Sequence, residues 1–240
     1  MNKENKKKIL SLEDKLESAK LYHRGGNLEK AEKLYREVLK EEPYNAQATH
    51  LLGLLAMQTG KLEIAKYLIE TAIKLDPNDP VFYVNLGVVY YLKKEFKKAK
   101  ELFEKAIDMD PDYAEAYANM GKLLAEEGNF SKSREFLLKA INLGDQEPST
   151  LITLAEVNYK IGLYDKVVNL CMQMIHELDI DENQVIELLV KSLLKLNKPL
   201  EAAEYLEILL QRDSKNPEYQ KYKEEIYKNL DLDVYSSVKQ

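Results

Sequence analysis

Apolar residues recur along most of this chain with the spacing of amphipathic helices. From Phe82 to Leu92, and again from Phe96 to Met109, they fall at i, i+3, i+4 and i+7, on one face of a helix with 3.6 residues per turn. Pro111 then follows, and a proline ends a helix because it lacks the amide donor and its ring clashes with the preceding turn. The pattern predicts pairs of short helices joined by tight turns.

These helical pairs repeat every 34 residues. The step is carried by Leu52-Gly53, Leu86-Gly87 and Met120-Gly121, and by the small residues Ala31, Ala65, Ala99 and Ser133. Gly87 and Ala99 have almost no side chain, so we expect the two helices of a pair to cross closely there. The chain is therefore predicted to be an all-α array in which each helical hairpin stacks on the next.

The repeated residues resemble those of a known family. Asn85, Leu86, Gly87, Tyr90, Ala99, Phe103, Ala106 and Pro111 closely match the tetratricopeptide repeat consensus. The resemblance implies an α-α superhelix, or solenoid, of about six hairpins. By this register the units start near Leu12, Ala46, Pro80, Ala114, Pro148 and Glu182 and span residues 12–216. The sixth unit aligns only after a one-residue insertion, which we expect near Asn197.

The two ends of the chain differ from the repeats. Residues 1–11 form a basic arm, which we expect to be a solvated terminus because no apolar helix face accompanies the lysines. Residues 217–230 place Tyr219, Tyr222, Ile226 and Leu230 on one stripe, which predicts a C-terminal capping helix over the last apolar face. Residues 231–240 have no such stripe, and we expect a flexible tail.

Composition and charge narrow the classes of function. Hydrophobic residues make up 45% of the chain, enough for a packed core, and the formal net charge is −6 with both signs interspersed, which argues against a nucleic-acid partner. No apolar run approaches the ~18 residues of a spanning helix, and the N-terminus lacks a signal peptide. We therefore expect a cytoplasmic protein without membrane insertion. Cys171 is the only cysteine, so no internal disulfide can form.

The residues that could carry chemistry do not form a recognisable site. His23, His50 and His176 lack the spacing of metal ligands, and we expect them to be polar surface residues. Cys171 takes the place that Phe103 has in its own unit, which predicts a buried small hydrophobe and not a nucleophile. There is also no glycine-rich phosphate loop. The sequence therefore predicts no metal, no cofactor and no enzymatic activity.

The family resemblance implies where a partner would bind. In this family the first helix of each hairpin lines the concave side of the superhelix, where relatives hold peptides. The candidate groove residues are then His50, Leu54, Val84, Asn85, Val88, Tyr91, Asn119, Lys122 and Glu126. The clamp that some relatives use for the acidic tails of chaperones is missing, because Glu115 stands where a lysine is needed and Leu16 and Lys20 replace the lysine and asparagine of the leading unit.

Two functions are compatible with the resemblance. The first is a non-catalytic scaffold that binds a protein or peptide segment, or further copies of itself, in the concave groove. The second is a regulatory or substrate-recruiting arm that works with a glycosyltransferase-like enzyme, because Asn85 and Asn119 resemble two rungs of the asparagine ladder in O-linked N-acetylglucosamine transferase. Asparagine also occurs at that place for structural reasons. The absence of a catalytic domain in the sequence favours the scaffold, whose partner the sequence does not identify.

Overall fold

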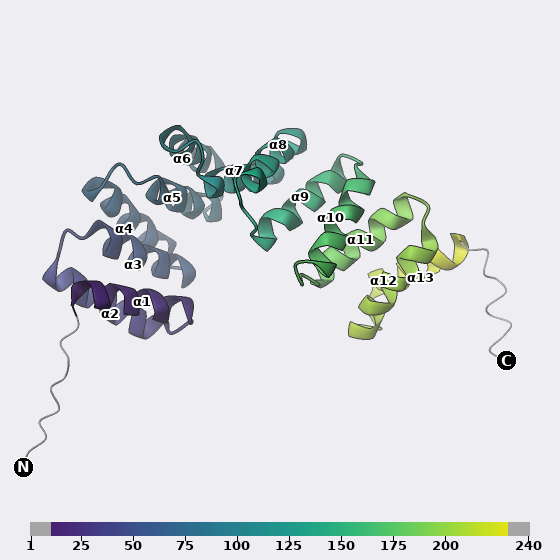
Figure 1. Ribbon diagram of the computed structural model, residues 1–240, viewed down its shortest axis with the longest axis horizontal. Coiled ribbons are helices and arrows are strands. Elements are labelled where there is room, and N and C mark those ends of the chain that lie inside the picture. The colour runs from purple at the N-terminus through teal and green to yellow at the C-terminus, as the bar shows by residue number, and fades with distance from the viewer. Residues whose placement is uncertain (1–10, 230–240) are drawn as a thin grey trace, which may run out of the picture. The chain divides into compact units, whose positions relative to one another are not determined.

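The computed structural model describes residues 11–229, and these residues form α-helices joined by short turns, with no strand among them (Figure 1). The helices are α1 (Leu12–Arg24), α2 (Leu28–Glu41), α3 (Ala46–Gln58), α4 (Leu62–Leu75), α5 (Pro80–Leu92), α6 (Phe96–Met109), α7 (Ala114–Glu126), α8 (Phe130–Asn142), α9 (Pro148–Lys160), α10 (Tyr164–His176), α11 (Asn183–Lys195), α12 (Pro199–Arg212) and α13 (Pro217–Asn229). The all-α fold is confirmed. Apart from Ser11, the predicted basic arm and tail lie outside the described residues.

The chain divides into two compact units, residues 1–119 and residues 120–240. The first contains α1 to α6 and the beginning of α7, and the second contains the rest of α7 and α8 to α13. Within each unit a helix packs on the helices before and after it in the chain. The helices thus form the stacked hairpins that the 34-residue step predicts.

The backbones of the first helices of successive hairpins contact one another, whereas those of the described second helices do not. In the first unit, α1 contacts α3 and α3 contacts α5; in the second, α9 contacts α11 and α11 contacts α13. The described second helices of successive hairpins, such as α2 and α4, make no comparable backbone approach. Because the first helices lie closer together than the second helices, they line the inner side of the curve in each unit.

The turn inside each hairpin needs a left-handed backbone at one fixed place. This place is the second residue after the last residue of the first helix, and it is held by Gly26, Gly60, Gly128 and Gly162, whose φ angles are 73° to 77°. Lys94 (φ 62°) and Asn197 (φ 57°) take the same place in the other hairpins. Glycine is favoured there because it has no Cβ to clash. The 34-residue repeat therefore includes the turn residue as well as the helices.

The extra residue of the sixth hairpin is not where the sequence suggested. The turn before α12 has the same three-residue length as the turn between α9 and α10, so the insertion expected near Asn197 is wrong. The spacing from the start of α10 to the start of α11 is instead one residue longer than between α8 and α9. That connection also contains Asp179 with φ 56°. A longer linker between hairpins changes no helix packing inside either hairpin.

Small residues let the two helices of a hairpin approach closely. A Cβ atom added to Gly53 would lie 2.8 Å from Cγ1 of Ile69, and one added to Gly87 would lie 2.5 Å from Cε1 of Phe103. The close crossing expected at these glycines is therefore present. Ser133 takes the place of alanine in the fourth hairpin, where its buried hydroxyl donates to the carbonyl of Gly121 at 2.7 Å. This bond removes the cost of burying a polar group.

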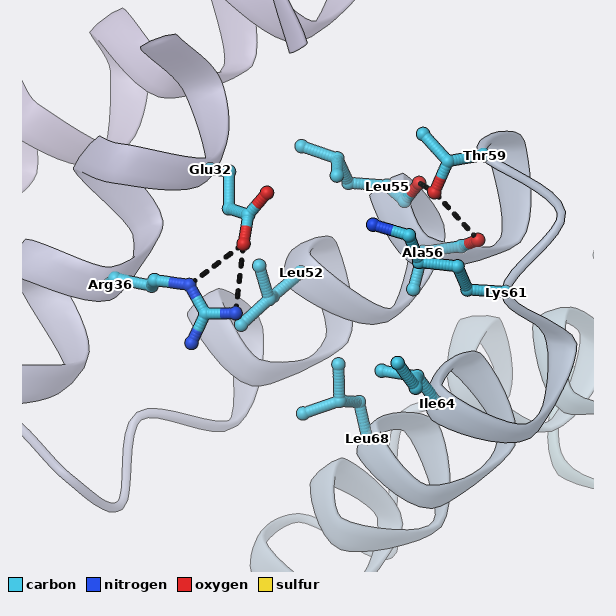
Figure 2. Close-up of a pocket in the computed structure, with 9 residues that line it drawn as sticks. All are labelled: Glu32, Arg36, Leu52, Leu55, Ala56, Thr59, Lys61, Ile64 and Leu68. Carbon is cyan, nitrogen blue, oxygen red and sulfur yellow. Dashed lines mark hydrogen bonds and ion pairs between the residues drawn. The ribbon is translucent and has the colours of Figure 1, made fainter. Parts of the chain in front are cut away.

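A second helix closes against the hairpin before it as well as against its own first helix. Figure 2 shows Ile64 and Leu68 of α4 beside Leu52 of α3, with Glu32 and Arg36 of α2 on the facing wall. Glu32 and Arg36 form an ion pair at 2.8 Å. The packing leaves a cavity of only about 50 Å³ between the three helices. α4 therefore leaves little free volume beside α2 and α3, with Leu68 packed against them and Ile64 at the edge 52% exposed.

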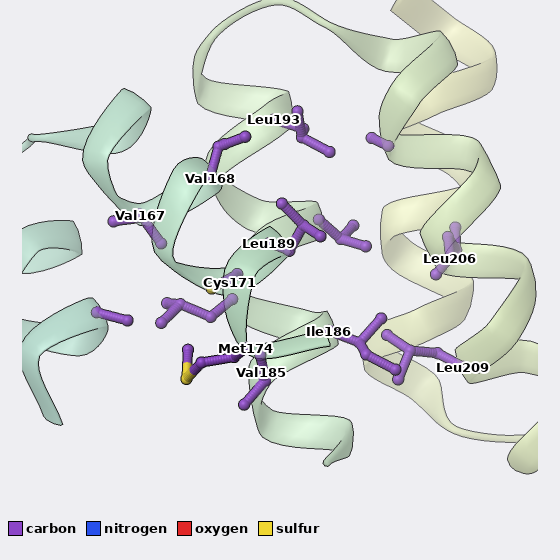
Figure 3. Packing of buried hydrophobic residues seen from close by; sticks show 14 of the residues in the cluster. Val167, Val168, Cys171, Met174, Val185, Ile186, Leu189, Leu193, Leu206 and Leu209 are labelled. Carbon is purple, nitrogen blue, oxygen red and sulfur yellow. The ribbon is translucent and has the colours of Figure 1, made fainter. Parts of the chain in front are cut away.

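The largest core of the second unit surrounds the contact between α10 and α11. Cys171 and Met174 of α10 pack there with Ile186 and Leu189 of α11, and all four are buried (Figure 3). Burial raises the pKa of the Cys171 thiol to about 12. The prediction that Cys171 is a small buried hydrophobe is confirmed.

Candidate functional site

The inner surface is built from rows of equivalent residues, which we number from the first residue of each first helix. The fifth residue of these helices is buried in each of the first five hairpins: Leu16, His50, Val84, Ala118 and Ile152. His50 is 4% exposed and Val84 is 0% exposed. These two candidate groove residues are therefore buried and are not accessible from the inner surface. Of the residues predicted to line the groove, Leu54, Val88 and Tyr91 are more accessible than His50 and Val84.

His50 takes part in a buried network between α3 and α5. Its ring lies 4.5 Å from the ring of Phe82, centroid to centroid, and its Nε2 accepts a hydrogen bond from Nδ2 of Asn85 at 3.1 Å. Burial lowers the pKa of His50 to about 4, so the ring is neutral near pH 7 and can accept this bond. The expectation that His50 is a surface residue is wrong, because its hydrogen-bond donor, Asn85, lies 35 residues further along the chain on the neighbouring first helix.

The amide of Asn85 is engaged inside the protein. Besides its bond to His50, Nδ2 donates to the carbonyl of Val81 at 2.9 Å, so both of its N–H groups have partners. Asn119 makes the same backbone contact in the fourth hairpin, from Nδ2 to the carbonyl of Glu115 at 2.9 Å. In both residues the amide ties the side chain to its own helix. Both asparagines therefore have a structural role in their own helices, which was one of the two roles that the sequence allowed.

The ninth and twelfth rows are the accessible part of the inner surface. In the second and third hairpins, the ninth residues of the first helices are Leu54 and Val88 and the twelfth are Met57 and Tyr91, and all four are half-buried. We call these four residues the inner apolar patch. They occupy equivalent places on α3 and α5, which contact each other. The patch therefore offers apolar side chains to solvent from two neighbouring helices.

The edge of the inner apolar patch carries positive charge. The ring of Tyr91 lies 5.7 Å from that of Phe96, and the Nζ atom of Lys94 lies 5.6 Å from the centroid of each ring. A lysine ammonium over aromatic faces is held by the ring quadrupole. An apolar partner residue against Tyr91 would thus lie beside a cation, which suits a segment that also carries an acidic group.

The inner surface of the second unit is polar. Lys122, which belongs to this unit, donates from Nζ to Oγ of Ser149 at 2.9 Å, and Glu126 is exposed. Glu156 accepts from Nε2 of Gln184 at 2.6 Å. Lys122 and Glu156 are ninth-row residues, like Leu54 and Val88, so the same row changes from apolar in the first unit to polar here.

The remaining histidines are bonded to neutral groups. Nε2 of His23 lies 2.9 Å from Oε1 of Gln58, and Nε2 of His176 lies 3.2 Å from the hydroxyl of Tyr205. In residues 11–229, the His, Cys, Asp and Glu side chains do not gather into a group of three or more that could hold a metal ion. The same part of the chain contains no helix that is both long enough and apolar enough to cross a bilayer.

The chain is similar to known proteins in its repeats and its fold. The family profile of the tetratricopeptide repeat matches residues 22–86 and 90–149, together just over half of the chain. No curated protein sequence matches it. Among solved structures, PilF of Pseudomonas aeruginosa superposes with a TM-score of 0.77 at 20% identity, over 89% of this chain and 97% of that one.

Two further structures have the same fold. PilW, described as a widely conserved type IV pilus biogenesis factor, has a TM-score of 0.76 at 20% identity over 88% of this chain and 97% of that one. YrrB, described as a protein of these repeats with an unusual peptide-binding site, has a TM-score of 0.63 at 18% identity over 79% and 97%. This fold generally serves as a scaffold for interactions between proteins. With the profile matched over its repeats and every described helix in a stacked hairpin or at its end, the chain belongs to the tetratricopeptide repeat family.

Proposed function

We propose that this chain is a non-catalytic scaffold that holds a segment of a partner protein against the inner apolar patch of Leu54, Met57, Val88 and Tyr91. The observation that carries the proposal is the half-buried state of these four side chains on the inner side of α3 and α5. A core side chain at these places would be fully buried, as His50 and Val84 are in the fifth row. The patch instead keeps apolar surface in contact with water, which a partner can cover.

Apolar contact should supply most of the binding free energy. Burying an apolar or aromatic partner residue against Val88 and Tyr91 contributes about 1.5–3 kcal/mol. A hydrogen bond to an asparagine amide contributes about 1 kcal/mol, and both N–H groups of Asn85 already have partners inside the protein. Specificity would then come from the apolar anchors and from the cation of Lys94 at the edge of the patch.

The bonds of Asn85 also bear on the alternative of a recruiting arm for a glycosyltransferase-like enzyme. An asparagine ladder needs amide groups that reach an extended peptide backbone. The donors of Asn85 instead reach His50 and Val81, and Asn119 is tied to Glu115. These contacts favour the scaffold, in which the asparagines stabilise the helices and the apolar residues bind.

The test compares patch variants with a matched aromatic control. Pull-down from the source cell with mass spectrometry identifies a partner, and calorimetric titration then measures its affinity for each purified variant. Tyr91→Ala and Val88→Glu should each weaken binding at least about tenfold, since the loss of a buried anchor costs about 1.5–3 kcal/mol. Tyr67→Ala removes an aromatic ring that is 70% exposed on the second helix α4 and should leave the affinity unchanged.

Circular dichroism first establishes that each variant keeps its helix content. Asn85→Ala should lower the melting temperature, because it leaves His50 without its donor, and should weaken binding less than the patch variants do. Loss of binding in Tyr67→Ala, with full binding in Tyr91→Ala and Val88→Glu, would place the partner on the outer face and refute the proposal.

A further inference from the structure

The last helix of the chain takes the place of a first helix. α13 begins at Pro217, which is 34 residues after Asn183 at the start of α11. It contacts α12 and α11 in the way that α5 contacts α4 and α3. A first helix in the other hairpins packs against a second helix that follows it. The described structure ends before any such helix, so the side of α13 that would receive it is free of a described helix.

A groove lies where that second helix would pack. It has a volume of about 370 Å³ and is lined by Ala203, Leu206, Glu207 and Leu210 of α12 and by Lys223, Ile226 and Tyr227 of α13. We call it the terminal groove. Five of its seven lining residues are apolar or aromatic, and Tyr227 is 48% exposed. Leu206 and Ile226 are buried, so the apolar surface left in contact with water here comes from Tyr227 with the half-buried Ala203 and Leu210.

The first unit contains the same surface in its filled state. Counted along their helices, Ala203 and Glu207 correspond to Glu32 and Arg36 of α2, while Lys223, Ile226 and Tyr227 correspond to Leu52, Leu55 and Ala56 of α3. There α4 packs Leu68 against the surface, with Ile64 at the edge still 52% exposed, and only about 50 Å³ remains (Figure 2). The protein itself thus shows that an amphipathic helix fits on a surface of this construction.

We propose that the terminal groove binds an amphipathic α-helix of another protein in the way that α2 and α3 bind α4. The bound helix presents apolar side chains at i and i+4, as α4 presents Ile64 and Leu68. Its charges complement the two walls of the groove, with a basic residue toward Glu207 on α12 and an acidic residue toward Lys223 on α13. Because these charges lie on opposite walls, they favour one direction of the bound helix over the reverse direction.

Two residues of α13 should make a helix bound in the terminal groove pack less closely than the second helix of a hairpin does. Lys223 and Glu224 stand where the second hairpin has Leu52 and Gly53. At Gly53 a single added Cβ would already lie 2.8 Å from Ile69 of the second helix. The longer side chains of α13 keep a helix from approaching so closely, so it buries less surface than α4 does. The expected complex is therefore reversible, as suits a partner in trans. This site is separate from the inner apolar patch.

The test uses a peptide copied from the helix that fills the equivalent surface. A fluorescein-labelled peptide of residues 61–76 is titrated with the full chain and followed by fluorescence anisotropy. Short peptides are only marginally helical in water, so a second version carries a lactam between Lys66 and Glu70, whose side chains pair at 3.9 Å on α4. Both should bind saturably, and the lactam version more tightly. The same peptide with Ile64→Glu and Leu68→Glu should not bind at these concentrations.

Variants of the chain locate the binding. Tyr227→Glu should weaken binding at least tenfold and Tyr227→Ala by a smaller factor. The control Tyr67→Glu, at an exposed tyrosine of α4, should leave binding unchanged. Failure of both peptides to bind saturably, or equal affinity in Tyr227→Glu, overturns the proposal. A chain truncated after Asn229 that binds much more tightly than the full chain would assign the groove to the segment that follows. A dimer in sedimentation that Tyr227→Glu disrupts would assign it to a second copy.

Discussion

Protonation of His50 should destabilise the first unit at mildly acidic pH. The neutral ring accepts the hydrogen bond from Nδ2 of Asn85, and it is packed against Phe82 with almost no access to water. A protonated ring would carry hydrogen on both nitrogens, so Nε2 would face the Asn85 amide as a second donor and a charge would be buried without a partner. Acid therefore breaks this network.

The magnitude follows from the two pKa values of His50. Its pKa is lowered from 6.5 to about 4 by burial, so between these values the unfolded chain binds more protons than the folded one. Stability is then fully present above about pH 6.5 and is lost as pH falls toward 4. Proton linkage gives a loss of about 1.4 kcal/mol at pH ~5.5 and roughly 2.5 kcal/mol at pH ~4.5.

The assay compares wild type with His50→Gln, which keeps an acceptor for the Asn85 amide but does not titrate. Urea unfolding followed by circular dichroism is measured at steps from about pH 7.5 to about pH 4.5. Carboxylates elsewhere titrate equally in both proteins, so the difference in unfolding free energy isolates His50. Wild type should lose about 2.5 kcal/mol relative to the variant over this range. A difference that stays constant with pH would show that His50 does not titrate as its burial implies.

Three further predictions concern packing. Gly87→Ala should lower the unfolding free energy by about 1–3 kcal/mol, measured by urea titration, because its Cβ would lie 2.5 Å from Phe103; unchanged stability would show that the helices can separate. Cys171 should react with a thiol reagent only as fast as the protein opens, since its thiol is buried with a raised pKa; rapid labelling of the native protein at neutral pH would contradict this. Deleting residues 217–240 should uncover the apolar surface of α12 and promote aggregation in light scattering, and unchanged solubility would argue against a capping role.

The local features of this fold could be predicted from the sequence. Helix periodicity, the 34-residue step and the small residues at Gly87 and Ala99 each depend on neighbours within one hairpin, so the sequence contains the whole interaction. The burial of Cys171 followed in the same way, because its place in the repeat is the one that Phe103 fills. The position of the sixth hairpin's extra residue did not follow, because a connection between helices has no periodic pattern to align.

Contacts between hairpins were decided only by the tertiary structure. Periodicity shows that His50 and Val84 lie on a different face from the hairpin's own core. It does not show whether that face contacts solvent or a neighbouring first helix. In the structure α3 packs on α5, so His50 is buried between them and accepts a hydrogen bond from Asn85 of the next hairpin. The same stacking left Leu54 and Val88 half-buried at the inner surface. A residue's partner one repeat away depends on how closely the helices approach, which no single hairpin's sequence contains.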